Sequence, residues 1–316
     1  MFRYILRRMG FLIFTLILTS ILIFVITQML PGDVARVILG REAGEQELQT
    51  LRLELGLNDP IPVRYLHWLS KYVTGDWGIS YSTKSEIRPL VMQRLRNSLR
   101  LAALTLLIVV PLAVSLGIIA GLNEQRWLDH VISIGSLVVV GLPEFVTGLV
   151  LIQIFAFNWK ILPANSSIPP DASFIETLPM LILPALTATL VLLAYIARMT
   201  RAGVIDELKK PYVRTADLKG LPRRTVIFKH ILRNSLLPTI TVIAVSIGWL
   251  IGGLIVIENV YNYPGLGRLL VFAIDRRDMP LIQALAMLIV IIFAMANLGA
   301  DLLYAALNPR IRLVDD

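Results

Sequence analysis

The chain carries, between two long apolar runs, the polar segment Pro211-Tyr212-Val213-Arg214-Thr215-Ala216-Asp217-Leu218-Lys219-Gly220-Leu221-Pro222. Proline can open a helix because its missing N–H falls where no partner exists, and glycine can close one because it tolerates positive φ. Pro211 and Gly220 therefore frame a predicted helix of about nine residues, roughly 13 Å long, and Pro222 stops its continuation. Small side chains near one face would let another surface approach closely, and we expect them at Thr215, Ala216 and Gly220.

The region around this helix, residues 198–235, is strongly basic. It contains ten Lys or Arg and three Asp or Glu, a net charge of +7 in 38 residues. One interpretation is that two spans hold the short helix beside a membrane, where it fits into a cleft of a partner. The other is that the basic side chains contact anionic lipid headgroups, at about 1 kcal/mol for each Lys or Arg near the surface. Residue chemistry alone leaves both interpretations open.

The residues that follow Pro222 predict an amphipathic helix at the membrane surface. Its apolar side would hold Val226, Ile227, Ile231 and Leu232, and its basic side Arg223, Arg224, Lys229 and Arg233. Such a helix would hold the preceding short helix rigidly against the next span. Stiffness matters because a mobile loop could not transmit a movement of a partner.

The composition predicts a protein that crosses a membrane several times. Of its 316 residues 56% are hydrophobic and 16% are charged, and the mean hydropathy is +0.72, beyond that of an ordinary soluble domain. Cysteine is absent, which excludes disulfides, thiolate metal sites and cysteine nucleophiles. The three histidines lack metal-ligand spacing, and no Gly-x-x-x-x-Gly-Lys-Ser/Thr phosphate loop occurs. If ATP drives this protein, we therefore expect the ATPase to be another polypeptide.

Six apolar runs are each near or above the roughly 20 residues that a helix needs to cross the hydrocarbon core. They comprise residues 11–30, 101–122, 131–157, 178–197, 236–257 and 281–307. The first run could instead be a secretory signal, but its apolar core is too long and no clear small-x-small cleavage site follows. The sequence therefore predicts an all-α integral membrane fold with six transmembrane helices.

The distribution of Lys and Arg predicts the orientation, because short cytoplasmic loops are rich in basic residues. It assigns residues 198–235 and both termini to the cytoplasm. Residues 31–100 carry ten basic and eight acidic residues, so we expect them outside, as a cap with short helices near 47–55 and 64–73. The predicted order is a first span in 1–30, the cap in 31–100, a five-helix core in 101–307 and a cytoplasmic tail in 308–316. The formal net charge of +8 fits this orientation and lipid contact better than nucleic-acid binding.

Prolines and glycines inside the apolar runs predict local features of the helices. Prolines can kink a span, and they occur at Pro111, Pro143 and Pro184. The small-x-x-x-small spacing lets helices pack closely, and it occurs at Gly117 with Gly121 and at Gly248 with Gly252.

Several motifs resemble a family of membrane transport proteins. Arg214-Thr215-Ala216 followed by Gly220, and His230 followed by Leu232-Arg233-Asn234 and Pro238, resemble the EAA loop of ABC-importer permeases. The resemblance is closest to the oligopeptide, dipeptide and nickel branch, because Arg214-Thr215 stands where the wider superfamily often has Glu-Ala. Motifs similar to that branch recur along nearly the whole chain, namely Leu30-Pro31-Gly32-Asp33, Glu54-Leu55-Gly56-Leu57, Gly75-Asp76-Trp77-Gly78-Ile79-Ser80, Tyr263-Pro264-Gly265-Leu266-Gly267-Arg268, Asp301-Leu302-Leu303-Tyr304 and Asn308-Pro309-Arg310-Ile311-Arg312.

The resemblance implies a type I ABC-importer permease fold with an N-terminal extracytoplasmic cap, in the inner membrane of a bacterial cell. In that family the short helix of the EAA loop is a coupling helix that docks into a groove of the ATPase subunit. Coupling then falls on Tyr212, Val213, Arg214, Thr215, Ala216, Asp217, Lys219, Gly220 and Leu221, and support of the loop on Arg223, Arg224, His230, Arg233, Asn234 and Pro238. An extracytoplasmic motif comprises Tyr263, Pro264, Gly265, Gly267 and Arg268.

The resemblance also implies the partners of the chain. We expect a heterodimer with a second homologous permease, two ABC ATPase subunits and an extracytoplasmic solute-binding protein, in a lipid bilayer and without nucleic acid. No cofactor or metal is expected on this chain, since ATP and Mg would bind the ATPase subunits.

Carboxylates inside the predicted spans are the remaining functional candidates. A charge in hydrocarbon costs about 2.5–3.5 kcal/mol, so such side chains usually face the protein interior. For Asp301 and Glu258 we expect a structural partner. Glu144 lies mid-span, where the resembled family more often has an uncharged residue. It either faces the translocation path and favours a cationic group on the substrate, or makes a neutral or hydrogen-bonded interhelical contact, and the sequence leaves both open.

These features predict a permease subunit of an ATP-driven importer of peptides, of the di- or oligopeptide class, or of a related small solute. Closure of two ATPases would push on residues 211–222 and reorient the spans by alternating access. Nickel or a metal chelate is the alternative cargo. Outside this class, an ion-coupled secondary transporter would usually bury more ionisable groups, and a membrane receptor or scaffold would need no such loop. The chain itself is not expected to be an enzyme.

Overall fold

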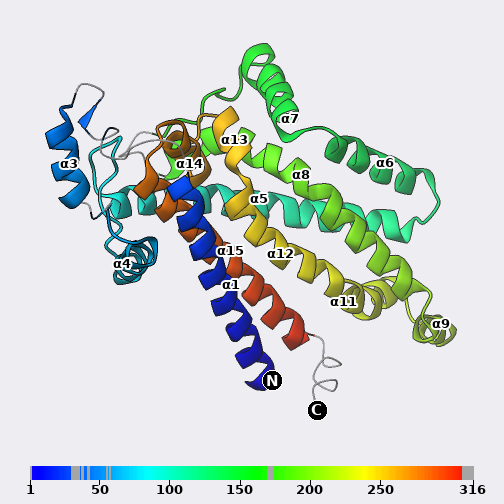
Figure 1. Cartoon of the computed structure of the whole chain (residues 1–316). Coiled ribbons are helices and arrows are strands. Elements are labelled where there is room, and N and C mark those ends of the chain that lie inside the picture. Colours follow the sequence, from blue (N-terminus) through cyan, green and yellow to red (C-terminus); the bar gives the residue numbers. More distant parts are fainter. Residues whose placement is uncertain are drawn as a thin grey trace. The chain divides into compact units, whose positions relative to one another are not determined.

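The computed structural model describes residues 2–29, 36, 39–40, 43–54, 56, 58–168 and 174–307. Helices account for most of these residues (Figure 1), and Ile79 and Glu86 form an isolated β-bridge. The helices are α1 (Phe2–Met29), α3 (Glu45–Glu54), α4 (Ile61–Thr74), α5 (Ile87–Leu122), α6 (Trp127–Gly141), α7 (Glu144–Leu151), η1 (Ile152–Asn158), α8 (Phe174–Leu208), α9 (Pro211–Leu218), α10 (Arg223–Thr225), η2 (Val226–Ile231), α11 (Leu232–Ser235), α12 (Leu237–Gly253), α13 (Ile255–Val260), α14 (Leu266–Asp275) and α15 (Met279–Leu307). The motifs at 30–33 and 308–312 lie outside the described residues.

The prediction of an all-α membrane protein is confirmed for the described part of the chain. Four helices are long and apolar enough to cross a bilayer, namely α1, α5, α8 and α15. Two further helix pairs pass the same test together, each bent at a short break, so the described residues hold up to six spans. The predicted number of six is met when each bent pair counts as one span.

The third span, predicted for residues 131–157 with a possible kink at Pro143, is sharply bent there. The helix α6 and the continuous pair of α7 and η1 meet at an angle of 103°. The break falls at Leu142 and Pro143, where Leu142 is extended with φ −87° and ψ 135°. Steric conflict with the ring of a following proline disfavours the helical conformation in the preceding residue. Of the three predicted proline effects, the one at Pro143 is thus a sharp break, whereas Pro111 and Pro184 lie inside continuous helices.

The helices α8 and α5 extend well beyond the apolar runs that predicted them. The helix α8 continues through Arg198 and Arg201 to Leu208, so the loop predicted to begin at 198 begins after this helix. Similarly, α5 begins at Ile87, inside the segment predicted as a cap. Hydropathy locates only the apolar part of a helix, and polar residues with good helix propensity extend the helix beyond it. The predicted cap helices are present as α3 and α4, and the outer location of 31–100 stays a prediction.

The contacts within the chain divide it into two compact units. The described residues within 99–263 and 295–307 belong to unit 1, and those within 2–98 and 264–294 belong to unit 2. This division follows contacts within the chain, whereas the predicted segments 1–30, 31–100, 101–307 and 308–316 follow membrane sidedness and stay a prediction.

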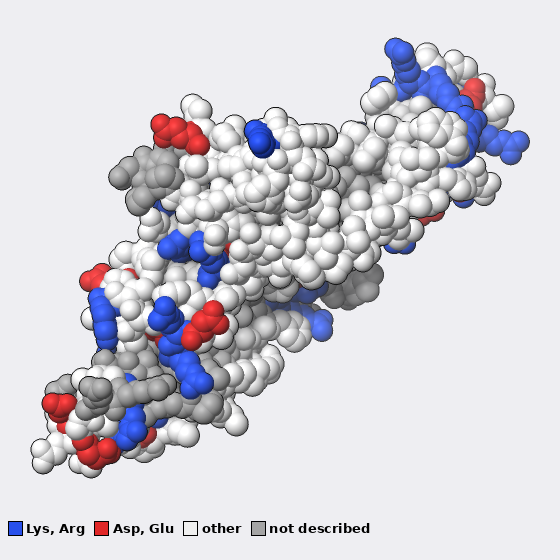
Figure 2. All heavy atoms as spheres, turned by 90° about the horizontal axis from the view of Figure 1, so that it is seen from above, with Lys and Arg blue, Asp and Glu red and all other residues white. Residues whose placement is uncertain are grey.

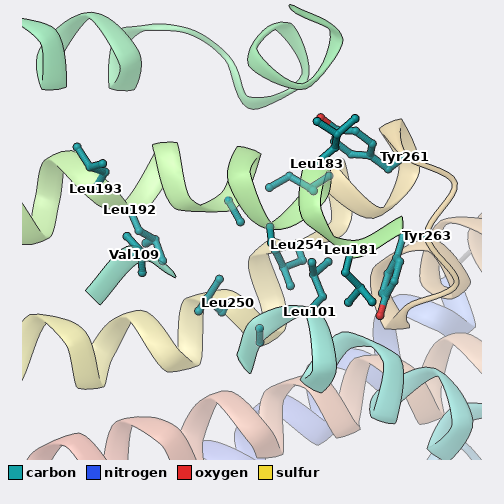
Figure 3. Packing of buried hydrophobic residues seen from close by; sticks show 14 of the residues in the cluster. Leu101, Val109, Leu181, Leu183, Leu192, Leu193, Leu250, Leu254, Tyr261 and Tyr263 are labelled. Atoms are coloured by element: carbon teal, nitrogen blue, oxygen red, sulfur yellow. The ribbon is translucent and has the colours of Figure 1, made fainter. Parts of the chain in front are cut away.

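The core of unit 1 forms around α8. Leu181 and Leu183 of α8, Leu101 of α5 and Leu254 before α13 belong to one buried cluster (Figure 3). Glycines allow α5 to approach α8 closely, because a Cβ atom at Gly117 would lie 2.5 Å from the carbonyl oxygen of Ala197. A Cβ atom at Gly121 would likewise meet Val204 at 2.8 Å. The first predicted small-x-x-x-small pair is therefore a packing contact within the chain.

Unit 2 contains α1, α3, α4, α14 and the adjoining parts of α5 and α15. An aromatic series joins α1 to α4 and the turn after it, through Phe24, Tyr65, Trp68, Tyr72 and Trp77, the last two rings stacked 5.1 Å apart. The predicted turn at 75–78 is confirmed by positive φ at Gly75 and Gly78. The buried carboxylate of Asp278 accepts hydrogen bonds from the Ser80 hydroxyl at 2.5 Å and the Ser82 N–H at 2.9 Å, which fixes the loop between α4 and α5.

Candidate coupling segment and cavity

The short helix predicted between Pro211 and Gly220 is present as α9. Pro211 occupies its first turn, and Gly220 follows its end with φ +72°, a value that favours glycine. The helix ends at Leu218, two residues before the predicted boundary. A further helical segment begins at Arg223 after Pro222. The start and stop signals of the sequence were therefore sufficient to predict this element.

One side of α9 is buried within the chain. Val213 and Ala216 are buried in a cluster with Val204 of α8 and with three residues of the following segment, Val226, Ile231 and Leu232. This cluster fixes α9 to the end of the long α8. The expectation that Ala216 shares an exposed small face with Thr215 and Gly220 is therefore not met, because its methyl group packs inside unit 1.

The other side of α9 faces outward. Its exposed residues are Pro211, Arg214, Thr215, Asp217 and Leu218, continued by Lys219 and Gly220. In Figure 2 blue Lys and Arg side chains gather at the upper right, the end of unit 1 that carries α9. Leu218 is 81% exposed although it is apolar and lies outside the spans. Sequence reasoning passed over this leucine, whose signal was an apolar residue among polar ones at the end of a short helix.

Tyr212 ties α9 to the elements on both sides. Its hydroxyl donates to the Glu207 carboxylate at the end of α8 and approaches the carbonyl oxygen of His230 at 3.3 Å. The side-chain amide of Asn234 donates to the same hydroxyl at 3.4 Å. Burial, followed by the hydrogen bond to Glu207, raises the pKa of Tyr212 above its usual value. The hydroxyl therefore stays protonated and able to donate at neutral pH.

The segment after α9 is amphipathic as predicted. Val226, Ile231 and Leu232 are buried and Ile227 is half-buried, whereas Arg223, Arg224, Lys229 and Arg233 are exposed. It is not one regular α-helix, because residues Val226–Ile231 form a π-helix between α10 and α11. Pro238 lies in the first turn of α12, where its missing N–H is tolerated. A polar recess of about 370 Å³ is lined by Tyr212, Lys229, His230, Arg233 and Asn234.

The end of this support segment lies directly on the backbone of α8. A Cβ atom added at Gly203 would lie 2.3 Å from the carbonyl oxygen of Ser235, far inside ordinary contact. Only glycine permits this approach of α11 to α8. Together with the buried cluster and the Tyr212 hydrogen bonds, this contact makes α8, α9 and α11 one packed assembly.

An ion pair near this end of unit 1 was not predicted from the sequence. Arg201 of α8 holds the buried Asp129 of α6 with two bonds, at 2.5 and 2.7 Å. The carboxylate also accepts from the Gln125 N–H at 3.0 Å and the Ser133 hydroxyl at 3.2 Å. The available signal was an acidic residue just before one predicted span and an arginine just after the next one.

Glu144 lines a large cavity of unit 1. The cavity has a volume of about 760 Å³ and is lined by residues of α6, α7, α8, α12 and α13. Glu144 begins α7 directly after the 103° break. The oxygen Oε2 of its carboxylate is buried and has no hydrogen-bond partner among the described residues. Glu258, by contrast, is buried and has a partner, and Asp301 has one as well.

The motif at 263–268 is anchored within each unit separately. In unit 1, Tyr263 is fully buried in the core cluster. In unit 2, the carbonyl oxygen of Pro264 accepts from the Asn97 amide at 2.9 Å, and the N–H of Leu266 donates to the Ser98 hydroxyl at 2.9 Å. Gly265 precedes α14, and Gly267 and Arg268 lie in its first turn. These contacts are structural, and the extracytoplasmic location of the motif stays a prediction.

Comparison with known proteins covers almost the whole chain. Residues 113–313 match a family described as "Binding-protein-dependent transport system inner membrane component", and residues 1–102 match the corresponding N-terminal family. The chain is 38% identical over 309 residues to a probable peptide ABC transporter permease protein of Sinorhizobium fredii. The aligned residues cover 98% of this chain and 99% of the relative. It is also 38% identical over 312 residues to a glutathione transport system permease protein of Escherichia coli, which covers 99% of both.

Proposed function

Because this chain belongs to the family of inner-membrane components of binding-protein-dependent transport systems, we propose that it is the permease subunit of an ATP-driven importer of small peptides. It is a multi-pass membrane protein. The names of its relatives refer to peptide and glutathione transport, which supports a peptide as cargo. Nickel or a metal chelate is the alternative cargo within the same class.

The observation that carries this proposal is the attachment of α9. This helix is fixed on one side to α8 and to the support segment, and it presents Arg214, Thr215, Asp217 and Leu218 on the other. A partner that contacts this exposed side moves α9 together with the end of α8, because the buried cluster and the hydrogen bond from Tyr212 to Glu207 hold the two helices together. Since α8 is one helix from Phe174 to Leu208, such a movement reaches the interior of the membrane. The coupling interpretation of the basic region is therefore favoured over simple lipid contact.

The proposed assembly contains this chain, a second homologous permease, two ATPase subunits and a solute-binding protein. The ATPases bind ATP and Mg and contact α9 on the cytoplasmic side, where both termini of this chain also lie. The binding protein delivers the peptide from the other side of the membrane. Alternating access results when closure of the ATPases reorients the spans around a central path. The chain itself supplies no catalytic group.

Reconstitution tests this function. The complete complex is purified through a tag on this chain and placed in proteoliposomes with ATP inside and binding protein with a labelled dipeptide outside. We expect uptake that requires ATP and the binding protein and that persists when ion gradients are dissipated. Uptake driven by an ion gradient without ATP would identify a secondary transporter instead. ATP-dependent uptake of nickel but of no peptide would assign the alternative cargo.

A further inference from the structure

The cavity of unit 1 has an uneven chemical lining. Most of its surface comes from apolar side chains, including Val139, Val191 and Val245. The described lining contains one carboxylate, Glu144, and no Lys, Arg or His. A cavity of about 760 Å³ falls within the range of small-molecule sites, which are mostly apolar with a few polar groups that orient the ligand.

The carboxylate of Glu144 lacks a hydrogen-bond donor at one of its oxygen atoms among the described residues. Its Oε2 atom is buried without a hydrogen-bond partner in the described part of the chain. The N-terminus of α7 compensates part of its negative charge, because Glu144 occupies the first turn of that helix. A buried carboxylate is nevertheless costly unless a donor or a cation contacts it. The empty acceptor position is therefore matched to a ligand that brings both a positive charge and N–H groups.

Other residues of the lining suit the same kind of ligand. Tyr195 of α8 and Trp249 of α12 are aromatic rings, whose faces attract cations. The hydroxyls of Thr241 and Ser246 donate to carbonyl oxygens of their own helix, at 3.3 and 2.8 Å. Their hydrogens are thus engaged, and their oxygen atoms can act only as further acceptors towards the cavity. The polar lining therefore offers a carboxylate, ring faces and hydroxyl acceptors.

We propose that this cavity binds a primary ammonium group of the transported solute, with Glu144 as its counter-ion and Tyr195 and Trp249 beside it. The inference rests on the proposed function, in which the natural source of such a group is the amino terminus of a peptide. A divalent metal ion fits less well, because Ca²⁺ and Mg²⁺ need several oxygen ligands and the lining supplies one carboxylate. The site selects for a positive charge during passage, after the binding protein has released the solute.

Transport of two matched solutes tests the proposal. The reconstituted complex is given one labelled dipeptide and its N-acetylated form, each at saturating binding protein, and the ratio of their uptake rates is measured. In Glu144→Gln we expect the uptake rate of the free dipeptide, divided by that of its N-acetylated form, to fall about tenfold or more, because a charge-assisted hydrogen bond to the ammonium group is lost. Glu144→Asp keeps the charge and should restore part of the ratio. Glu86→Gln, an exposed glutamate of unit 2, is the matched control and should leave the ratio unchanged.

The uptake of the two solutes in Glu144→Gln distinguishes an ammonium site from a structural contact. A selective loss of the free peptide in Glu144→Gln supports the ammonium site. An equal loss of both solutes, or no loss, would overturn it, because a structural contact does not distinguish the two cargoes.

A binding measurement keeps the proposal testable even if the cargo is not a peptide. Tryptophan fluorescence of the purified complex is titrated with ethylammonium chloride, and with propionamide as a neutral probe. We expect the fluorescence to change saturably with ethylammonium but not with propionamide. This change should be absent in both Trp249→Phe and Glu144→Gln. The same change in Glu144→Gln as in the wild type would refute the site. A complex that imports no peptide yet shows this titration would contradict the proposed cargo and leave the ammonium site supported.

Discussion

The contact between Gly203 and Ser235 yields a prediction about how α9 is held. A Cβ atom at Gly203 would lie 2.3 Å from the Ser235 carbonyl oxygen, whereas ordinary contact begins at 3.4 Å. Because the obstructing atom belongs to the backbone of α11, rotation of a side chain cannot relieve the conflict. Gly203→Ala must therefore move α11 away from α8 by about 1 Å, or distort one of the two helices.

The expected energy follows from two opposing effects. Overpacking of a well-packed interface costs about 1–3 kcal/mol. Replacing glycine by alanine inside a helix returns about 0.5–1 kcal/mol. The net destabilisation is therefore about 1 kcal/mol, within a range of about 0–2.5 kcal/mol, and it is concentrated where α11 meets α8. We expect ATP hydrolysis to continue while less uptake follows from each ATP, because the displaced α11 no longer moves with α8.

The assay compares Gly203→Ala with Gly299→Ala in proteoliposomes. The control makes the same chemical change inside the long helix α15, where a new Cβ atom would meet nothing within 4 Å. We expect a lower ratio of uptake to ATP hydrolysis and a lower thermal midpoint in detergent for Gly203→Ala alone. Equal behaviour of the two variants would refute the reasoning, since it would mean that the close approach of α11 is not needed.

Three further predictions concern named hydrogen bonds. Tyr212→Phe removes the donor to Glu207 and should lower uptake per ATP while the complex still assembles, at a cost of about 0.5–1.5 kcal/mol in thermal stability. The pKa of Tyr212 is raised in the folded protein, so the stability contributed by its protonated hydroxyl is fully present below about pH 10 and is lost as the pH rises through the pKa of the folded state. Ionisation of Tyr212 should therefore leave uptake per ATP unchanged between about pH 7 and pH 9. Arg201→Ala leaves the Asp129 carboxylate buried without its cation and should cost about 3–5 kcal/mol, and Arg201→Lys should rescue little because lysine lacks the two-pronged geometry; full rescue by lysine in a thermal-unfolding assay would contradict this. Tyr261→Phe removes bonds to the Thr187 hydroxyl at 2.8 Å and the Gly148 carbonyl oxygen at 3.1 Å, and it should lower the thermal midpoint more than Tyr195→Phe, whose side chain is exposed.

Local signals in the sequence were sufficient for the short elements around the coupling segment. Pro211 and Gly220 fixed the start and end of α9 to within two residues. The alternation of apolar and basic residues from Arg223 to Asn234 predicted which side chains are buried. These features depend on backbone restriction and on burial of one helix face, both of which act within a few residues.

Features that depend on packing between distant residues could not be predicted in the same way. The pair of Asp129 and Arg201 joins residues 72 positions apart, and nothing local signals their contact. Burial of Ala216 depends on Val204 and Ile231 being present beneath it. The break at Pro143 was visible as a proline, but its angle of 103° depends on how α6 and α7 pack on α8. An apolar run by itself cannot distinguish a straight span from a bent one.

Labelling of a single cysteine on α9 tests the central claim most directly, since the chain has no cysteine of its own. Leu218→Cys places a thiol at a position that is 81% exposed. It is exposed to a membrane-impermeant maleimide in right-side-out and inside-out vesicles, with and without the ATPase subunits. We predict labelling from the cytoplasmic side only, and protection when the ATPases are bound. Labelling from the outer side, or equal labelling with and without the ATPases, would contradict a coupling role for α9.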